Sequence, residues 1–221
     1  MLTVFEKYSN GIAFSRNSIV MTTPSKETYH HGNLHQALID AAIVQIRNHG
    51  ADKVSLRGIA REVGVSQSAP YRHFSDKAEL LTAIANQGYQ LLGEVMRHHY
   101  ETHRDDPVVA LKAAGISYIE FARSHPEMYR LMFGVMARQL KQTSTNANPQ
   151  EGYCVLKDII SSGIELGKFK NFPVETLAFT TWSVVHGFSS LLLDGLIELD
   201  DEHLLHVSRE LTSIVVEGVG Q

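Results

Sequence analysis

The sequence predicts an all-α fold, in which a three-helix helix-turn-helix head is joined by one long helix to a larger helical body. Apolar residues recur at three- and four-residue steps from Leu34 onward, and strand-like alternation is nearly absent. Residues 55–73 hold a short helix, a glycine turn and a second short segment, and residues 76–100 form one long helical pattern. With 221 residues, of which 43% are hydrophobic and 20% charged, the chain can bury a core, and collagen-like or disordered structures are excluded.

The elements of the head follow from their end signals. Asn33 is an N-cap for a first helix whose apolar positions end at the stop in residues 48–50. Ser55 caps a second helix over residues 56–63, which Gly64 ends because glycine readily takes positive φ. Ser66 starts a third, short segment over residues 67–73.

The long helix over residues 76–100 would extend about 37 Å at about 1.5 Å per residue, enough to link a head to a separate body. Further helices are predicted near residues 107–124, 126–140, 151–167, 173–193 and 201–217. Pro107, Pro126 and Pro173 stand at first helical turns, where proline is tolerated. Residues 141–150 form a low-complexity loop.

The cellular compartment of the protein is predicted from sequence features that it lacks. Charged and polar residues interrupt each apolar run in the first twenty residues, so we expect no secretory signal and a flexible arm over residues 1–29, with Met21 as an alternative start. A single cysteine, Cys154, permits no internal disulfide and favours the cytoplasm. Residues 176–193 lack charge but hold several Thr and Ser, too polar for a lipid-facing helix, so no membrane partner is expected.

The segment over residues 55–73 carries the chemistry of the head. Leu56, Ile59 and Ala60 supply packing between its helices, which leaves the polar side chains of residues 67, 68, 71 and 72 to point outward. The N-terminal residues of such a second helix meet base edges in the major groove of DNA. Residues 26–77 carry a net charge of +2 and residues 78–221 one of −7, which suits a protein that presents one end to a polyanion.

Residues 29–85 resemble the DNA-binding head of the TetR family of one-component repressors. The pair Tyr71 and Phe74, followed by Asp76, Lys77 and Leu80, matches the family pattern. The resemblance implies a DNA-binding domain over residues 30–77 and a ligand-binding and dimerisation domain over residues 78–221. It also implies a homodimer that binds palindromic double-stranded operator DNA and releases it when a small molecule enters the body.

Nine residues match the family's DNA-contacting positions. Gln67, Ser68 and Ala69 match the positions that read bases. Tyr71, Arg72 and His73 match the positions that contact phosphate and the groove wall, and Lys77 matches a further phosphate contact. Ser55 and Arg57 match the positions at which the preceding helix contacts the DNA backbone. Pro70 departs from the pattern, because the family more often has an apolar residue such as leucine there. Proline removes an amide and costs about 3 kcal/mol in a regular helix, so we expect a short or distorted recognition helix.

In the body, Trp182, His186 and Gly187 resemble the signature of the WHG class of TetR-type C-terminal domains, and residues 126–134 resemble the same class. An aromatic wall beside an imidazole suits a small-molecule site, and methionines with further aromatics could line an adaptable cavity. The candidate ligand-binding residues are Tyr118, Phe121, Tyr129, Met132, Phe133, Met136, Trp182 and His186. The alternative is an ordinary core, with His186 bonded to a backbone carbonyl.

Residues 176–193 bear no formal charge on any face, so the helix must be covered on several sides. We expect residues 173–193 and 201–217 to pair with their symmetry mates in a four-helix interface. Leu191, Leu192, Leu205 and Ile214 are the expected contacts. The alternative is a buried central helix in a monomer.

The sequence favours a ligand-responsive repressor in the cytoplasm, associated with the nucleoid, over other classes. His99 and His103 stand four residues apart beside His98, but Tyr100 occupies the place of a metalloprotease glutamate, so no metal or other cofactor is expected. No nucleophile-elbow, P-loop or dinucleotide motif is present, which argues against an enzyme. The alternative function is a DNA-bound adaptor that acts through protein partners, whose body cavity would be filled by side chains.

Overall fold

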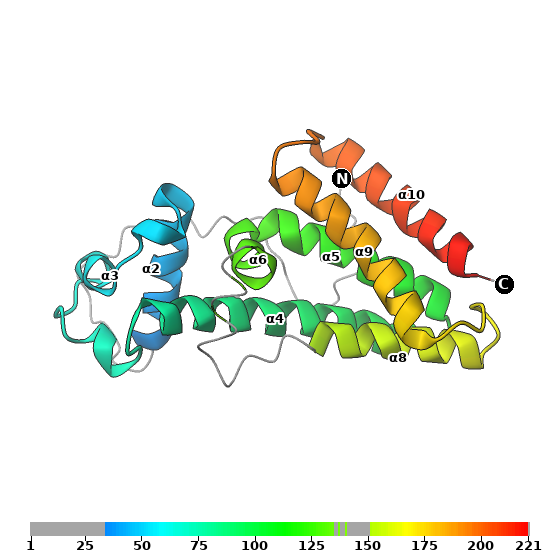
Figure 1. The fold of residues 1–221 in the computed structure, drawn as a ribbon, viewed down its shortest axis with the longest axis horizontal. Coiled ribbons are helices and arrows are strands. Elements are labelled where there is room, and N and C mark those ends of the chain that lie inside the picture. The colour runs from blue at the N-terminus through cyan, green and yellow to red at the C-terminus, as the bar shows by residue number, and fades with distance from the viewer. Residues whose placement is uncertain (1–33, 135–136, 138–139, 141–150, 221) are drawn as a thin grey trace. The chain divides into compact units, whose positions relative to one another are not determined.

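The computed structural model describes residues 34–134, 137, 140 and 151–220. Within these residues it contains helices and no β-strand, apart from one isolated bridge between Phe169 and Gly220, which confirms the all-α prediction. Figure 1 shows the arrangement of the helices. They are α2 (Leu34–His49), α3 (Leu56–Val63), α4 (Lys77–Thr102), α5 (Pro107–Ser124), α6 (Pro126–Phe133), α8 (Glu151–Glu165), α9 (Val174–Leu193) and α10 (Asp201–Val219), with 3₁₀ turns η1 (Ala51–Lys53) and η2 (Pro70–Arg72).

The helix ends predicted at Ser55, Gly64 and Asp76 are confirmed, whereas the predicted N-cap Asn33 lies outside the described residues. The Ser55 hydroxyl accepts the Gly58 amide at 3.1 Å and so caps α3. Gly64 ends this helix with φ 78°, a left-handed conformation that favours glycine. Asp76 caps α4 by accepting the Glu79 amide at 2.9 Å. The arm over residues 1–29 and the loop over residues 141–150 lie outside the described residues.

Two predicted helices differ from the structure. The segment after Ser66 forms only the 3₁₀ turn η2, because Pro70 has no amide to donate. The backbone instead forms hydrogen bonds that span three residues, such as the bond from the His73 amide to the Pro70 carbonyl oxygen at 2.9 Å. The distortion expected from Pro70 is therefore present. The helix predicted over residues 126–140 is interrupted: α6 stops at Phe133, since Gly134 is extended, and Ala137 and Leu140 are again helical. A Cβ on Gly134 would lie 2.4 Å from the Arg130 carbonyl oxygen, so this bend requires glycine.

Residues 35–221 form one compact unit whose core lies around α4 and α5. Helix α4 packs against α5, α6 and α8, and α5 also packs against α8, α9 and α10 (Figure 1). In the part of the unit built from α2, α3 and the start of α4, Leu38, Ile59, Phe74 and Leu80 are at most 2% exposed. Burial of such side chains contributes about 1.5–3 kcal/mol each and fixes the helix-turn-helix.

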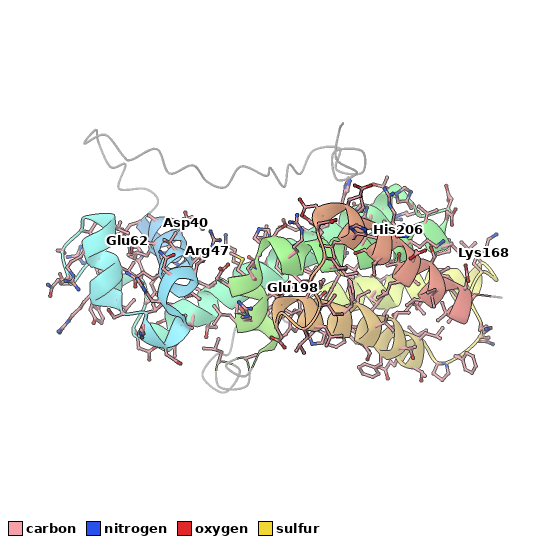
Figure 2. The ribbon with its side chains drawn as sticks, turned by 90° about the horizontal axis from the view of Figure 1, so that it is seen from above. Asp40, Arg47, Glu62, Lys168, Glu198 and His206 are labelled. Carbon is pink, nitrogen blue, oxygen red and sulfur yellow. The ribbon has the colours of Figure 1, made fainter. Side chains whose placement is uncertain are left out.

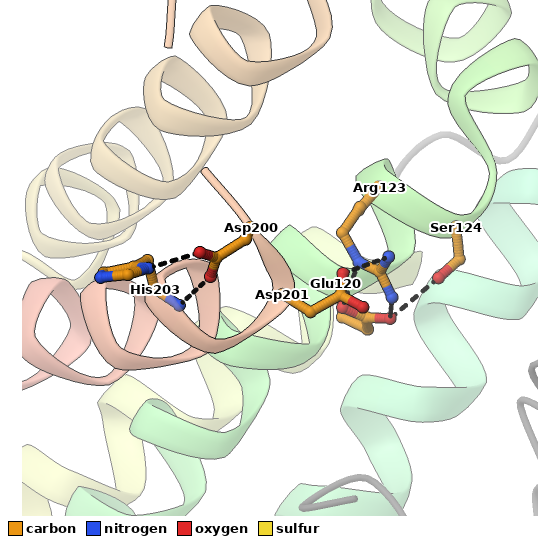
Figure 3. A network of polar contacts seen from close by, with 6 residues as sticks. All are labelled: Glu120, Arg123, Ser124, Asp200, Asp201 and His203. Atoms are coloured by element: carbon orange, nitrogen blue, oxygen red, sulfur yellow. Dashed lines mark hydrogen bonds and ion pairs between the residues drawn. The ribbon is translucent and has the colours of Figure 1, made fainter. Parts of the chain in front are cut away.

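The N-terminus of α10 is held against α5 by charged groups. Arg123 of α5 binds Glu120 on its own helix and Asp201 on α10, at 2.5 and 3.3 Å. Asp200 caps α10 by accepting the His203 amide at 2.9 Å, and its other oxygen bonds the His203 ring at 2.7 Å (Figure 3). These contacts fix the residue at which α10 starts and hold that end of the helix against α5.

Helix α9 is unusually apolar for its degree of burial. Among the described helices it is long and apolar enough to cross a membrane by length and composition alone, with a mean hydropathy of 1.2 over its 18-residue window. Only 33% of this window is buried inside the chain. Most of the helix therefore lacks a covering within this protomer.

Candidate DNA-binding surface and ligand cavity

The segment after the α3 turn presents its polar side chains outward, as the sequence predicted. Gln67, Ser68, Tyr71 and Arg72 are exposed, and Tyr71 is 48% exposed although it is a large aromatic. Pro70 and Phe74 are buried on either side of it. These two anchors turn Tyr71 and Arg72 toward solvent, where a phenol and a guanidinium can reach phosphate and groove edges.

The remaining predicted DNA-contacting residues have different surroundings. Arg57 and His73 are exposed, whereas Ala69 is half-buried in the turn. The Ser55 side chain is exposed but its oxygen already caps α3. The Lys77 ammonium donates to the Asp52 carbonyl oxygen at 2.6 Å, so it is held in place at the start of α4. Most of the predicted DNA-contacting side chains thus lie at the surface of the helix-turn-helix.

A partly enclosed cavity of about 70 Å³ lies in the body, with walls from six helices. Its lining residues are Tyr89, Leu92, Met96, Leu111, Ala114, Gly115, Tyr118, Phe133, Gly152, Tyr153, Leu156, Thr181, Trp182, Val185, Thr212 and Val215. Of the eight predicted ligand-binding residues, three line it: Tyr118, Phe133 and Trp182. With a volume of about 70 Å³, the cavity is smaller than the binding sites of drug-sized ligands, which have volumes of about 300–1,000 Å³.

The other five predicted residues do not line the cavity or cannot be placed. Phe121 is buried and stacks on His125, with ring centroids 5.1 Å apart. Met132 packs against Gly88 on α4, where an added Cβ would lie 2.5 Å from the Met132 sulfur. Tyr129 and His186 lie behind Tyr118 and Phe133 as a second layer. Met136 lies outside the described residues.

Four of the predicted side chains form one hydrogen-bonded network. The Trp182 indole donates to the Tyr118 hydroxyl at 3.1 Å. The hydroxyls of Tyr118 and Tyr129 both reach Nδ1 of His186, at 2.9 and 2.7 Å. Burial lowers the pKa of His186 and raises that of Tyr118, so both are neutral at physiological pH. The histidine is satisfied by two phenols rather than by a backbone carbonyl.

Sequence reasoning missed much of the lining, most notably Tyr89 and Tyr153. Tyr89 lies on α4 and donates to the Met132 carbonyl at 2.5 Å, which ties the end of α6 to α4. Tyr153 lies on α8, at the third residue of that helix. Helical spacing shows that each residue has neighbours on its own face, but it does not show which other helix meets that face.

Helix α6 is also tied to the head. Arg47, in the last turn of α2, donates to the carboxylate of Glu127 in the first turn of α6 at 3.0 Å. The side chain of Glu127 is 9% exposed and that of Arg47 is 60% exposed. Figure 2 labels Arg47 on α2, together with Asp40 on the same helix and Glu62 on α3. One short helix therefore touches both the head and the network behind the cavity.

A second, open hollow lies on α9 and α10, with a volume of about 710 Å³. It is lined by Phe172, Thr176, Leu177, Thr180, Val184, Val207, Glu210, Leu211, Ile214, Val215, Gly218 and Val219. Ile214 is 67% exposed at this surface and Phe172 is 53% exposed. Of the other predicted contacts, Leu191 is exposed, and Leu192 and Leu205 are half-buried.

A helix-turn-helix with an outward polar segment, attached to a helical body with an apolar cavity, is the architecture of a DNA-binding transcriptional regulator. Residues 38–84 match the model of bacterial regulatory proteins of the tetR family. Residues 111–214, which include Trp182, His186 and Gly187, match the tetracyclin repressor-like C-terminal domain. The chain belongs to the TetR family of transcriptional regulators.

Individual relatives agree with this assignment. An HTH-type transcriptional regulator of Mycobacterium tuberculosis is 35% identical in an alignment that covers 43% of this chain and 44% of that relative. A second, uncharacterized HTH-type transcriptional regulator of the same species is 27% identical over 76% of this chain and 85% of its own length. A protein of unknown function from Rhodococcus sp. RHA1 is 25% identical, with a TM-score of 0.74 over 89% of this chain and 100% of that structure.

Proposed function

We propose that the protein is a cytoplasmic, ligand-responsive transcriptional repressor that binds a palindromic operator as a homodimer and is released by a small molecule. The observation that supports this proposal most is that the chain combines two features: the outward polar segment of the helix-turn-helix, and a partly enclosed apolar cavity that is linked to the head through α6. Residues 30–77 serve as the DNA-binding head in this proposal, and residues 78–221 as the body.

Operator contact in this proposal divides between positioning and reading. Tyr71, Arg72 and His73 meet phosphate and groove wall, since they are exposed beside the buried Pro70 and Phe74. Gln67 and Ser68 stand at the exposed start of the segment, where a side chain can reach base edges. Lys77 neutralises a phosphate, and its bond to the Asp52 carbonyl holds the ammonium ready.

The outer face of α9 and α10 is the surface that a second copy covers. Two thirds of the α9 window is not buried within the chain, and apolar side chains such as Ile214 and Phe172 are exposed beside it. Uncovered apolar patches of this kind mark interaction sites. A two-fold partner suits an inverted-repeat operator, because each half-site then receives one head.

Ligand release follows from the small size of the cavity. A ligand larger than about 70 Å³ must push its walls apart, and two of those walls, Tyr118 and Phe133, contact Tyr129 of α6. Tyr129 lies two residues from Glu127, which holds Arg47 in the head. A ligand that binds the expanded body more tightly shifts the population toward heads that no longer match the operator.

The adaptor function is less well supported. It predicts that side chains fill the space beside Trp182, whereas Trp182 lines a cavity of about 70 Å³. Membership of the TetR family likewise indicates a regulator rather than an enzyme.

The test is retardation of operator DNA, selected from a random pool, by the full chain. Tyr71→Ala should weaken binding at least tenfold, whereas Lys77→Ala should weaken all sequences alike and lower the slope of affinity against salt by about one ion. Lys168→Ala is the matched control, because Lys168 is exposed beyond the end of α8 (Figure 2). Unchanged retardation by both head variants would refute the proposed function.

A further inference from the structure

The cavity lining carries no charge among the described residues. Its sixteen residues are aliphatic or aromatic residues, one methionine, glycines and threonines. The nearby Lys157 is not part of the lining; its ammonium lies 5.3 Å from the centroid of the Tyr153 ring. A charged ligand would lose its hydration here without gaining a counter-ion, which is strongly unfavourable.

Most polar groups of the lining already have partners within the protein. The Tyr89 hydroxyl donates to the Met132 carbonyl, and the Trp182 indole donates to Tyr118. The hydroxyls of Thr181 and Thr212 donate to carbonyls of their own helices, at 3.1 and 2.9 Å. A ligand therefore cannot use these donors without breaking a bond that exists.

Tyr153 is the exception. Its hydroxyl oxygen is buried and has no hydrogen-bond partner among the described residues. Its ring is held by stacking on Phe179, with centroids 5.6 Å apart, and by Trp182 at 5.9 Å, so the hydroxyl is fixed in direction. Buried tyrosine hydroxyls usually have a partner, and a missing one is unfavourable.

We propose that the ligand is an uncharged, mainly apolar molecule with a single hydrogen-bonding group, which pairs with the Tyr153 hydroxyl. This inference rests on the proposed function, because it takes the cavity as the ligand site. The walls supply apolar contact through Phe133, Trp182 and Leu156, and Tyr153 supplies the one polar contact that gives orientation.

The size of the cavity sets the second requirement. An apolar cavity of about 150 Å³ holds benzene, and this one has about 70 Å³. A ring-sized ligand therefore enters only when side chains of the lining move. Met96 and Leu92 are unbranched at Cβ and can change rotamer without breaking a hydrogen bond, whereas Tyr118 and Trp182 can shift only within their hydrogen-bonded network.

Trp182 provides the readout, because it is the one tryptophan of the sequence and lines the cavity. Its fluorescence is titrated with cyclohexanol, cyclohexane, cyclohexylammonium and cyclohexanecarboxylate, which share a ring and differ in one group. We expect cyclohexanol to bind at least fivefold more tightly than cyclohexane, and the two ions to give no response. Binding of either ion as tight as that of cyclohexanol, or no response to any probe, would overturn the proposal.

Two variants locate the polar contact. Tyr153→Phe keeps the ring, so cyclohexane should bind as before while the fivefold preference for cyclohexanol disappears. Tyr89→Phe is the matched control, since its hydroxyl is already bonded to Met132 and the preference should remain. A preference that survives Tyr153→Phe overturns the proposal. Both variants are first checked by circular dichroism and by operator retardation without probe; retardation that persists while the preference fails leaves the proposed function standing and refutes this inference alone.

Discussion

Removal of the Arg47 charge should destabilise the protein more than removal of its partner's charge. In Arg47→Met the apolar stem remains, but the carboxylate of Glu127, only 9% exposed, loses its cation. In Glu127→Gln the remaining Arg47 charge is 60% exposed and stays hydrated. The two halves of one ion pair therefore have unequal costs.

The expected loss of unfolding free energy lies between the values known for surface ion pairs and for buried ion pairs. A surface pair contributes about 0–1 kcal/mol, whereas loss of one partner of a buried pair costs about 3–5 kcal/mol. Because water screens the exposed Arg47, we expect a loss of about 1–2 kcal/mol for Arg47→Met and less than about 1 kcal/mol for Glu127→Gln.

Urea unfolding of the parent, both single variants and the double variant forms a thermodynamic cycle. Each residue also interacts with the end of its own helix, by about 0.3–1 kcal/mol, and this contribution cancels in the cycle. We expect a coupling free energy of about 1 kcal/mol. Effects that add within about 0.3 kcal/mol, or a larger loss for Glu127→Gln, would show that the pair does not hold α6 to the head.

Three further predictions follow from single positions. Gly64→Ala should lower the free energy of unfolding by about 1–2 kcal/mol because φ is 78° there, and no atom lies near the added Cβ to confuse the cause; Gly64→Asn should cost less, and equal losses in urea unfolding would contradict this reasoning. In the folded protein the pKa of His99 is lowered from 6.5 to about 4, chiefly by burial and then by two neighbouring histidines. Between pH 6.5 and 4 the unfolded chain therefore binds a proton at this residue that the folded chain does not bind. Stability should therefore fall by about 3 kcal/mol as pH drops through this window, less steeply in His99→Gln, and a parallel pH profile in that variant would contradict it. Ile214→Glu should place two charges in the proposed dimer interface and halve the mass seen by light scattering, whereas Leu166→Glu, 52% exposed outside that surface, should keep it; an unchanged mass for Ile214→Glu would count against this interface.

The sequence predicted those parts of the fold that are decided within four or five residues. Ser55 and Asp76 cap their helices through bonds three residues away, and Gly64 ends α3 by its own φ. The irregular recognition segment was also predictable, because Pro70 lacks an amide wherever the rest of the chain lies. The bend at Gly134 was missed, since apolar spacing continues across it and only the backbone clash with Arg130 reveals it.

The site was predictable only where side chains share a helix. Trp182 and His186 stand four residues apart and do meet, with ring centroids 5.8 Å apart. Tyr153 meets Trp182 from another helix, and Arg47 meets Glu127 across 80 residues of sequence. Such encounters depend on how helices cross, and the spacing within a single helix contains no information about that.

The His186 ring has one further consequence. With its proton on Nε2, a neutral imidazole offers one lone pair at Nδ1, yet two phenols point at it, at 2.7 and 2.9 Å. Only one can donate fully at a time, and the Tyr118 hydroxyl is also placed to donate to Tyr129, at 3.4 Å. The same heavy-atom positions thus admit more than one arrangement of protons, and a small displacement of Tyr118 can exchange one for another without leaving a polar atom unpaired. A wall with such degeneracy rearranges at low energetic cost, and this wall separates the cavity from Tyr129 of α6.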